Sequence, residues 1–467
     1  MATEKDVYKV LSELEQRILG ISDDPSLKKD PRTGYIISML QESAFINPDD
    51  YANPAQPGIT DDDPATTTKR QQALANLCDL VDHKLAMDGS GMAIPSTTPI
   101  SQTWELIINS ANAMPGTDKT DPALQKSIEE ANKLLFSTDA DGNVTESKAY
   151  LNYQDYRNKY NDAVDKLSDE YLNARSDPAK FQQWPTRGLR FKDDARAAWD
   201  KWMAMGKKKE IEAALDFISA QGTDAAVHCI ANAKRRLEDN RMLLGSNQYY
   251  YVSVSPSNWA DPNAVEGWAE YTYDSTKSKT SETASSRKWS GKAGFWKISA
   301  SASGSKTTLD TSSQEEKLTI KFNYAFVTIN WHAFTTILPN IGNWFVKNNR
   351  KGCVSNGTAN QQKPANETSW LPAITTKMVV VKNVTINSSE IVKNSSEITN
   401  TLKAGGKIGW SVFSGSGSYE KTSSSKQTGV ELTSEGLVFH GAQVIAFAQE
   451  ILPMCPQFDD PSLNAHS

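Results

Sequence analysis

Residues 281–308 read SETASSRKWSGKAGFWKISASASGSKTT, and residues 396–423, SEITNTLKAGGKIGWSVFSGSGSYEKTS, align with them at a constant offset of 115 without a gap. Eleven of the 28 aligned positions are identical. Shared serine-richness raises such a match, but it does not bring glycines and lysines into register, as at Gly291/Gly406 and Lys292/Lys407. We therefore expect two copies of one β unit that pack as related halves, because neither copy could bury its apolar face alone.

Length and charge limit the possible classes of protein. A chain of 467 residues is long for one hydrophobic core, so two or three domains are expected, and 38% apolar residues with 23% charged residues is a globular composition. Residues 1–250 carry 30 positive and 39 negative side chains, against 20 and 17 in residues 251–467. This balance argues against nucleic-acid binding, and the weakly basic second half suits an anionic surface better than a duplex.

The start of the chain and its cysteines bear on the compartment. MATEKDVYKVLSELEQ has no apolar stretch behind a basic start, so no signal peptide is expected, and no run of about 18 apolar residues predicts a transmembrane helix. We expect synthesis in the cytoplasm, with release by lysis or by a dedicated secretion system. The cysteines form no CxxC motif, so free buried thiols are expected at Cys78, Cys229, Cys353 and Cys455, with a Cys353–Cys455 bridge as the alternative.

The first half of the chain has the apolar spacing of helices. Over 147–176, tyrosines such as Tyr153, Tyr160 and Tyr171 recur with aliphatic residues at helical spacing, which is typical of a helix-packing seam. Further helices are expected over residues 4–20, 34–46, 67–87, 101–114, 122–136, 193–206, 208–220 and 223–242.

At Gly245 the apolar period changes from that of helices to that of strands. Residues 318–329, LTIKFNYAFVTI, place their large apolar side chains on one face and polar ones on the other, which predicts a half-buried antiparallel strand. Strands are also expected over residues 249–255, 268–274, 378–386 and 436–448.

These patterns predict an α+β fold class in two domains. An N-terminal all-α helical bundle is expected over residues 1–245 and an antiparallel β domain over 246–456, followed by a C-terminal tail, 457–467. The β domain would hold the internally duplicated Ser/Gly-rich hairpin unit, over about 265–330 and 380–448. Strand 268–274 should then correspond to 383–389, and the segment after Gly291 to the one after Gly406.

No pattern in the sequence nominates a catalytic or metal site. The histidines His83, His228, His332 and His440 each stand alone, and no GxSxG or HExxH motif occurs. DADGNVTES at 139–147 fails the positional requirements of a calcium loop. GKKK at 206–209 lacks the glycine spacing and the Ser/Thr of a phosphate-binding loop, so it is interpreted as a turn. The sequence predicts no enzyme, no cofactor and no bound metal.

Both repeated segments alternate between apolar and polar residues. In the first copy Trp296 and Ile298 point to one side and Lys297, Ser299 and Ser301 to the other. In the second copy the apolar or small side holds Phe413, Gly415, Gly417 and Tyr419, opposite Ser414, Ser416 and Ser418. A membrane-spanning strand needs about 9–11 residues with one lipid face and one polar face, and it must close into a barrel.

In composition and layout these segments are similar to the inserting hairpins of several β-pore-forming toxins, which are rich in Ser/Thr, Gly and Lys and stay soluble until oligomerisation. No family signature accompanies the likeness. The aromatic stretch WHAFTTILPNIGNWF, 331–345, either covers the β core or forms an exposed interface. The residues expected to contact lipid or neighbouring protomers are Trp296, Lys297, Ile298, Ser299, Ser301, Trp410, Phe413, Tyr419, Trp331 and Trp344.

Two functions fit this sequence best. The first is a pore-forming or membrane-attacking, toxin-like protein that oligomerises and inserts amphipathic β-hairpins. The alternative is a self-assembling structural protein that oligomerises through β edges without catalytic activity. A carbohydrate- or protein-binding module would not need duplicated hairpins, and Ser/Gly-alternating strands also occur in conventional sheets that never enter a membrane. The expected partners are a lipid membrane or cell-surface receptor and further copies of the chain, and no nucleic acid.

A pair of lysine substitutions tests the alternation. Ile298→Lys should abolish permeabilisation and leave the soluble fold intact, because a charge that faces the middle of the bilayer costs about 2–4 kcal/mol. Ser301→Lys, on the opposite face, should be tolerated and should alter only ion selectivity. Dye release from liposomes measures the first effect and single-channel recording the second; equal behaviour of the two variants would contradict the assignment of faces.

Overall fold

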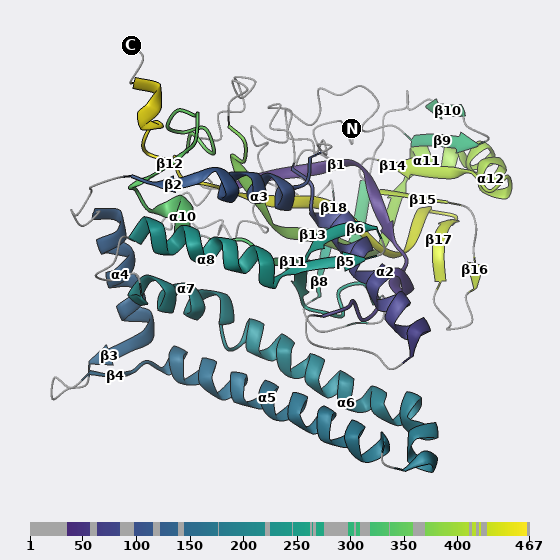
Figure 1. Ribbon diagram of the computed structural model, residues 1–467. Coiled ribbons are helices and arrows are strands. Elements are labelled where there is room, and N and C mark those ends of the chain that lie inside the picture. Colours follow the sequence, from purple (N-terminus) through teal and green to yellow (C-terminus); the bar gives the residue numbers. More distant parts are fainter. Residues whose placement is uncertain are drawn as a thin grey trace.

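The computed structural model describes most of the chain outside several loops and both ends. The described residues are 35–56, 63–84, 98–114, 122–138, 144–175, 177–219, 225–244, 246–261, 264, 268–274, 298–302, 305–308, 318–335, 337–357, 369–410, 413–416, 420–421 and 427–464. The protein is a mixed helix and sheet structure in which the larger helices cover one face of a curled antiparallel sheet (Figure 1). The helix predicted over 4–20 lies outside the described residues.

Three long strands form the centre of the sheet. β13 (Ala373–Ser388) pairs with β11 (Leu318–Trp331) on one side and with β18 (Gly436–Ile451) on the other. β11 then pairs with β8 (Ala269–Asp274) and, further along, with β7 (Val252–Ser255). β18 pairs in the same way with β17 (Gln427–Leu432) and with β1 (Tyr35–Ile46). The strands expected over 268–274, 318–329, 378–386 and 436–448 are thereby confirmed.

Bulges bend this sheet. The β13–β18 register shifts at three places, one of them between Lys382 and Val384, and Asn383 there has a φ of 54°. A bulge adds an unpaired residue to one strand and increases the local twist. The bulges along β13 and β18 therefore account for the curl of the sheet.

The described helices surround the sheet; those of residues 122–239 lie below it in Figure 1, and those of residues 389–403 lie beside it at the right. The helices are α2 (Pro64–Val81), α3 (Ile100–Ser110), α4 (Pro122–Leu135), α5 (Lys148–Arg175), α6 (Pro178–Ala204), α7 (Lys208–Ser219), α8 (Ala225–Asp239), and the short α10 (Ile337–Asn340), α11 (Ser389–Lys393) and α12 (Ser395–Lys403). The remaining short elements are η2 (Pro48–Tyr51), β2 (Ala111–Ala113), β3 (Phe136–Thr138), β4 (Val144–Glu146), β5 (Arg241–Leu244), β6 (Asn247–Tyr250), β9 (Ile298–Ala302), β10 (Ser305–Thr308), β12 (Trp344–Val346), β14 (Lys407–Trp410), β15 (Phe413–Ser416), β16 (Glu420–Lys421) and η3 (Pro461–Asn464).

The helix predicted over 34–46 is wrong, because this segment is strand β1. The two buried serines of β1 meet glutamines of β18: Gln449 Nε2 donates to Ser38 Oγ (2.9 Å), and Ser43 Oγ donates to Gln443 Oε1 (2.5 Å). Pairing with β18 satisfies both the backbone and these side chains, so the tertiary context overrides the local apolar spacing. A segment near the N-terminus thus completes a sheet made by the C-terminal half.

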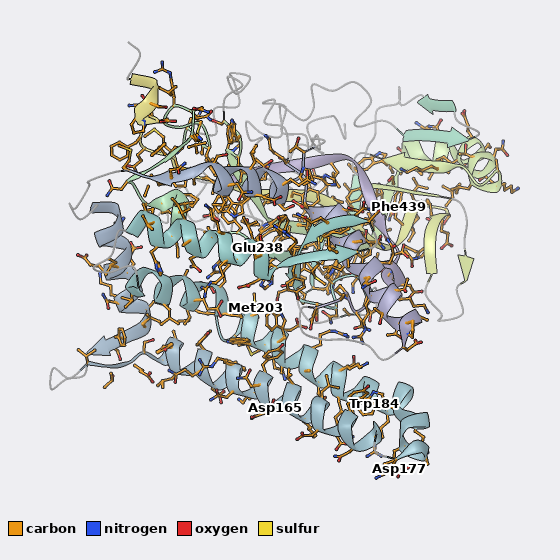
Figure 2. The ribbon with its side chains drawn as sticks, viewed as in Figure 1. Asp165, Asp177, Trp184, Met203, Glu238 and Phe439 are labelled. Atoms are coloured by element: carbon orange, nitrogen blue, oxygen red, sulfur yellow. The ribbon has the colours of Figure 1, made fainter. Side chains whose placement is uncertain are left out.

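α6 begins fifteen residues earlier than the predicted start at 193, and it continues through Pro185 and Gly188. Asp177 caps its first turn, with its carboxylate accepting from the N–H of Ala179 at 2.9 Å. A Cβ on Gly188 would lie 2.7 Å from the Trp184 ring, so a glycine here lets the ring lie flat on the helix. Trp184, labelled in Figure 2, packs on Tyr171 of α5 at 5.6 Å between ring centroids, and this packing offsets the two helix-breaking residues.

The tyrosine stripe of α5 is a packing seam, as predicted. Tyr153 and Tyr160 lie 5.6 Å and 5.5 Å from the Trp202 ring of α6, and Tyr160 also contacts Trp199 at 5.1 Å. These contacts join α5 and α6 into the long helical hairpin at the bottom of Figure 1.

The helices and the sheet share one hydrophobic core. A single cluster contains Leu74 of α2, Trp104 of α3 and Ile230 of α8 together with Val327 of β11 and Val444 of β18. The two-domain layout with a separate helical bundle therefore stays a prediction. The cysteines Cys78, Cys229, Cys353 and Cys455 are all buried and free.

The strand β1 gives a stability test. Ile46 is fully buried in the shared core, so Ile46→Ala should lower the free energy of unfolding by about 2–5 kcal/mol. Leu243→Ala is the control, because Leu243 is 71% exposed and its truncation should change stability by no more than about 0.5 kcal/mol. Urea unfolding measures both; equal effects would mean that β1 is not docked in the sheet.

Candidate membrane-inserting hairpins

Two long connections leave the sheet at the same end. One joins β8 to β11 through residues 275–317, and the other joins β13 to β18 through residues 389–435. They contain the two repeated segments. Their described strands are β9 and β10 in the first connection and β14 to β17 in the second. In Figure 1 these strands lie together at the right of the molecule.

The strands that carry these connections pair in the same register. Phe322 of β11 faces Tyr271 of β8, and when both numbers are advanced by 115 they give Leu437 and Ile386, which face each other in β18 and β13. Tyr324↔Ala269 and Phe439↔Val384 correspond in the same way. The offset found in the sequence therefore also relates the strand pairs at the base of the two connections.

The two connections also pair with each other. β9 of the first and β14 of the second are antiparallel neighbours, with Ser301 opposite Lys407 and Ile298 opposite Trp410. β10 and β15 flank them, which gives a small sheet in the order β10-β9-β14-β15. The described parts of the two repeated segments thus lie side by side.

The tip of the second connection is in phase with the sheet. β14 and β15 form a hairpin in which Lys407 faces Ser416 and Trp410 faces Phe413. The last β13–β18 pair before this connection is Asn387↔Gly436. Residues 388–406 on one arm and 417–435 on the other are both 19 long, so the tip pairs continue the β13–β18 register without a slip.

The apolar side of this hairpin is buried against the large sheet. Ile408, Trp410 and Phe413 are almost inaccessible and belong to the cluster that covers one face of β8, β11, β13 and β18. The Phe413 ring lies 5.9 Å from Phe322 and 6.4 Å from Phe439, which is labelled in Figure 2. Lys407, whose neighbours along β14 are buried, is exposed. The apolar side of the hairpin is therefore stored against the sheet, whereas on the other side Lys407 is exposed and Gly409 and Ser414 are buried.

A group of three buried polar residues, here called the clasp, joins the hairpin to the sheet. Its members are Ser43 of β1, Ser414 of β15 and Gln443 of β18. The Ser414 N–H lies 3.1 Å from Ser43 Oγ and 3.3 Å from Gln443 Oε1, and Ser414 Oγ donates to the Ser43 carbonyl at 3.3 Å. Gln443 Nε2 is buried and has no hydrogen-bond partner within the described part of the chain.

Some of the predicted contact residues are placed by the structure and others are not. Trp331 and Trp344 are 6% and 0% exposed, so these rings cover the core and form no exposed interface. Trp410 and Phe413 come together in the hairpin, and the backbones of Ile298, Ser299 and Ser301 lie in β9. Trp296, Lys297 and Tyr419 lie outside the described residues. Sequence reasoning missed Ser43 and Gln443, because Ser43 was assigned to a helix.

A comparison of the chain with known protein families, curated proteins and solved structures finds no match. Among the described residues, no helix is both long and apolar enough to cross a membrane. The same residues contain no group of three His, Cys, Asp or Glu side chains that could hold a metal ion.

Proposed function

We propose that this chain is a pore-forming, toxin-like protein whose two duplicated connections unfold from the side of the sheet and extend its strands as two membrane-inserting β-hairpins. The observation that carries the proposal is the in-phase tip at β14 and β15, with arms of equal length back to β13 and β18. A hairpin that extends from this base needs no change of register. A conventional loop would have no reason to keep such phasing.

The side chains near the tip suit a strand with one lipid face. Counting back from the tip, Leu402, Ala404, Ile408 and Trp410 share one side of the first arm, and Lys403 and Lys407 lie on the other. The apolar stretch is about as long as the 9–11 residues that a transmembrane strand needs. The lysines would face water inside the barrel.

Insertion would exchange one apolar environment for another. Ile408, Trp410 and Phe413 now lie against the sheet, and in an extended hairpin they would lie against lipid, so these side chains stay in an apolar environment. The apolar face of the sheet that they cover would lose this contact. The clasp is the part without a lipid equivalent, and its hydrogen bonds contribute about 0.5–1.5 kcal/mol each. Ser414, opposite Phe413 in the alternation, would gain water in the barrel lumen.

Both arms must change conformation: on the second arm β17 has to leave its pairing with β18, and on the first arm the longest helical segment is short. α12 has nine residues and includes β-branched Ile398, Thr399 and Thr401. Isolated helices of this length are marginal in water, and β-branched residues favour strands. Its conversion into the arm of a hairpin therefore needs only the loss of packing, chiefly of Ile398, which is fully buried.

An inserted sheet must close, because lipid cannot satisfy a free strand edge. One chain would supply two hairpins, which are too few strands for a barrel that encloses a water-filled channel. The proposal therefore includes a homo-oligomer on a lipid membrane. This proposal gives the duplication of the hairpin unit a role, because each copy would contribute one hairpin to the wall of the barrel.

A disulfide across the clasp tests the proposal. Ser43 Oγ and Ser414 Oγ are 3.1 Å apart, so Ser43→Cys with Ser414→Cys places two thiols where a bridge can form after a small adjustment. The oxidised double variant should release no dye from liposomes, and reduction should restore release to the wild-type level. Each single cysteine variant is a control and should behave alike under both conditions.

Two results would contradict the proposal. One is dye release by the oxidised double variant at the wild-type rate, once mass spectrometry has shown a disulfide between the peptides that carry the two substitutions. The other is a wild-type protein that releases no dye on any of several lipid compositions. Filaments in negative-stain images of such an inactive protein would favour the alternative, self-assembly through β edges.

A further inference from the structure

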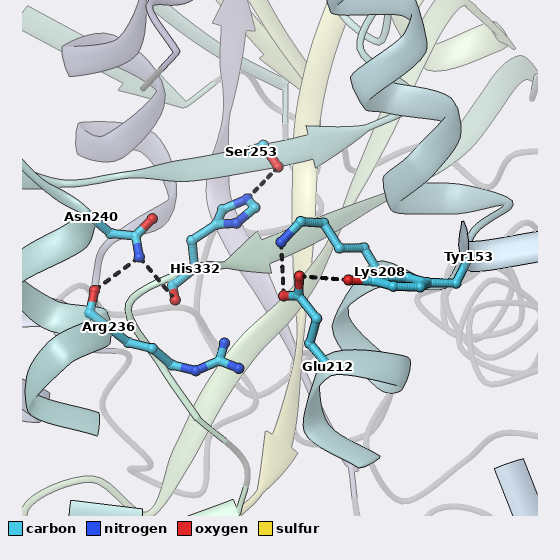
Figure 3. Close-up of polar contacts among 7 residues, drawn as sticks. All are labelled: Tyr153, Lys208, Glu212, Arg236, Asn240, Ser253 and His332. Carbon is cyan, nitrogen blue, oxygen red and sulfur yellow. Dashed lines mark hydrogen bonds and ion pairs between the residues drawn. The ribbon is translucent and has the colours of Figure 1, made fainter. Parts of the chain in front are cut away.

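A cavity of about 420 Å³ lies between the helices and the sheet, far from the hairpins. Ligand pockets typically measure about 300–1,000 Å³. Its walls come from α6, α7, α8 and the ends of β7 and β11, and Figure 3 shows its polar groups. The charged side chains that line it are Lys208, Lys209, Arg235, Arg236, Glu212 and Asp239.

The four cations of the wall come from the two ends of neighbouring helices. Lys208 and Lys209 are the first two residues of α7, directly after Lys207, whose φ of 49° reverses the chain. Arg235 and Arg236 lie near the C-terminal end of α8. The N-terminus of α7 adds the positive end of a helix dipole to the lysines.

The carboxylates in the wall do not balance these cations. Glu212 is engaged on both oxygens, with Lys208 Nζ at 2.8 Å and the Tyr153 hydroxyl donating at 3.2 Å (Figure 3). Asp239 is the other carboxylate of the wall, and Glu450 and Glu210 act on Lys209 from outside it. Four cations and two carboxylates therefore line the cavity.

Burial and the neighbouring charges shift the pKa of two groups in the wall. The pKa of His332 is lowered to about 3, first by burial and then by repulsion from Lys208, Lys209 and Arg236. His332 is therefore neutral at physiological pH, and its Nε2 lies 2.9 Å from Ser253 Oγ (Figure 3). The pKa of Lys209 is also lowered, chiefly by burial, although Glu450 and Glu210 oppose the shift.

Aromatic rings complete the wall. Trp199, Tyr251 and Trp331 all line the cavity, and the ring of Tyr251 lies 4.7 Å from that of His332. The indole Nε1 of Trp199 is buried and has no hydrogen-bond partner among the described residues. A buried donor without a partner costs free energy, which a ligand oxygen would recover.

We infer that this cavity binds a small phosphorylated polyol, such as an inositol or sugar phosphate, with its phosphate groups at Lys209, Arg235 and Arg236 and its ring against Trp199. A phosphate monoester carries nearly two negative charges at neutral pH, which matches the excess in the wall. Guanidinium groups bind phosphate oxygens in pairs, and the Trp199 donor suits a hydroxyl or phosphate oxygen. The ligand is either free in solution or the headgroup of a lipid.

Calorimetric titration of the full-length protein with inositol trisphosphate tests the inference. The wild type should bind it, and Lys209→Met should weaken binding at least about tenfold, because a hydrogen bond to a charged group is lost. Lys126→Met is the matched control: Lys126 is 78% exposed on α4, outside the cavity, so affinity should not change. Trp199→Phe keeps a ring and removes the donor, so it should weaken binding about twofold to tenfold.

A thermal melt accompanies each titration. Inositol trisphosphate should raise the melting temperature of the wild type, since it binds only the folded state. If Lys209→Met does not fold, Trp199→Phe still tests the inference, because this variant keeps every charged side chain of the cavity. The inference is overturned if inositol trisphosphate does not bind, if Lys126→Met weakens binding as much as the cavity variants, or if neither cavity variant has an effect.

Vesicles distinguish the two sources of the ligand. Phosphatidylcholine vesicles with and without a phosphatidylinositol phosphate are sedimented with the wild type and with Lys209→Met. Binding that needs the phosphoinositide, is competed by inositol trisphosphate and is lost in Lys209→Met identifies a lipid headgroup. Calorimetric binding without sedimentation identifies a soluble ligand. Sedimentation that inositol trisphosphate does not compete would contradict a headgroup pocket.

Discussion

The pairing of β13 with β18 is the interaction on which the rest of the structure depends. The free edge of β13 pairs with β11, and the free edge of β18 pairs with β1 and β17. β11 in turn holds β7 and β8. Because both strands are buried nearly throughout, their bulges set the curvature that the helices below must follow.

The curved sheet gives the molecule two unlike ends. At one end the helices close over it, and the space left between α6, α7 and α8 is lined with four cations and two carboxylates. At the other end the sheet carries the two connections; in the second, Ile408, Trp410 and Phe413 are buried, and the clasp joins Ser414 to β1 and β18. The proposed binding site and the proposed conformational change thus lie at opposite ends of one framework.

The sequence predicted the elements with a strong periodic pattern and missed those fixed by distant partners. The long strands and most helices follow apolar spacing, and the repeat offset of 115 carries over to the pairs at Phe322 and Leu437. β1 was predicted as a helix because its partner lies about 400 residues away. The cavity was missed because GKKK has the pattern of a turn, and only the fold brings its lysines opposite Arg235 and Arg236. Spacing within a segment says nothing about such distant neighbours.

The pairing of β9 with β14 has a consequence for kinetics. If only one connection left its place, the other would be left with an unpaired strand edge of amides and carbonyls. The departure of the first segment therefore lowers the barrier for the second, and a half-released chain is a poor intermediate. Release should follow a single exponential, with both segments in one cooperative unit.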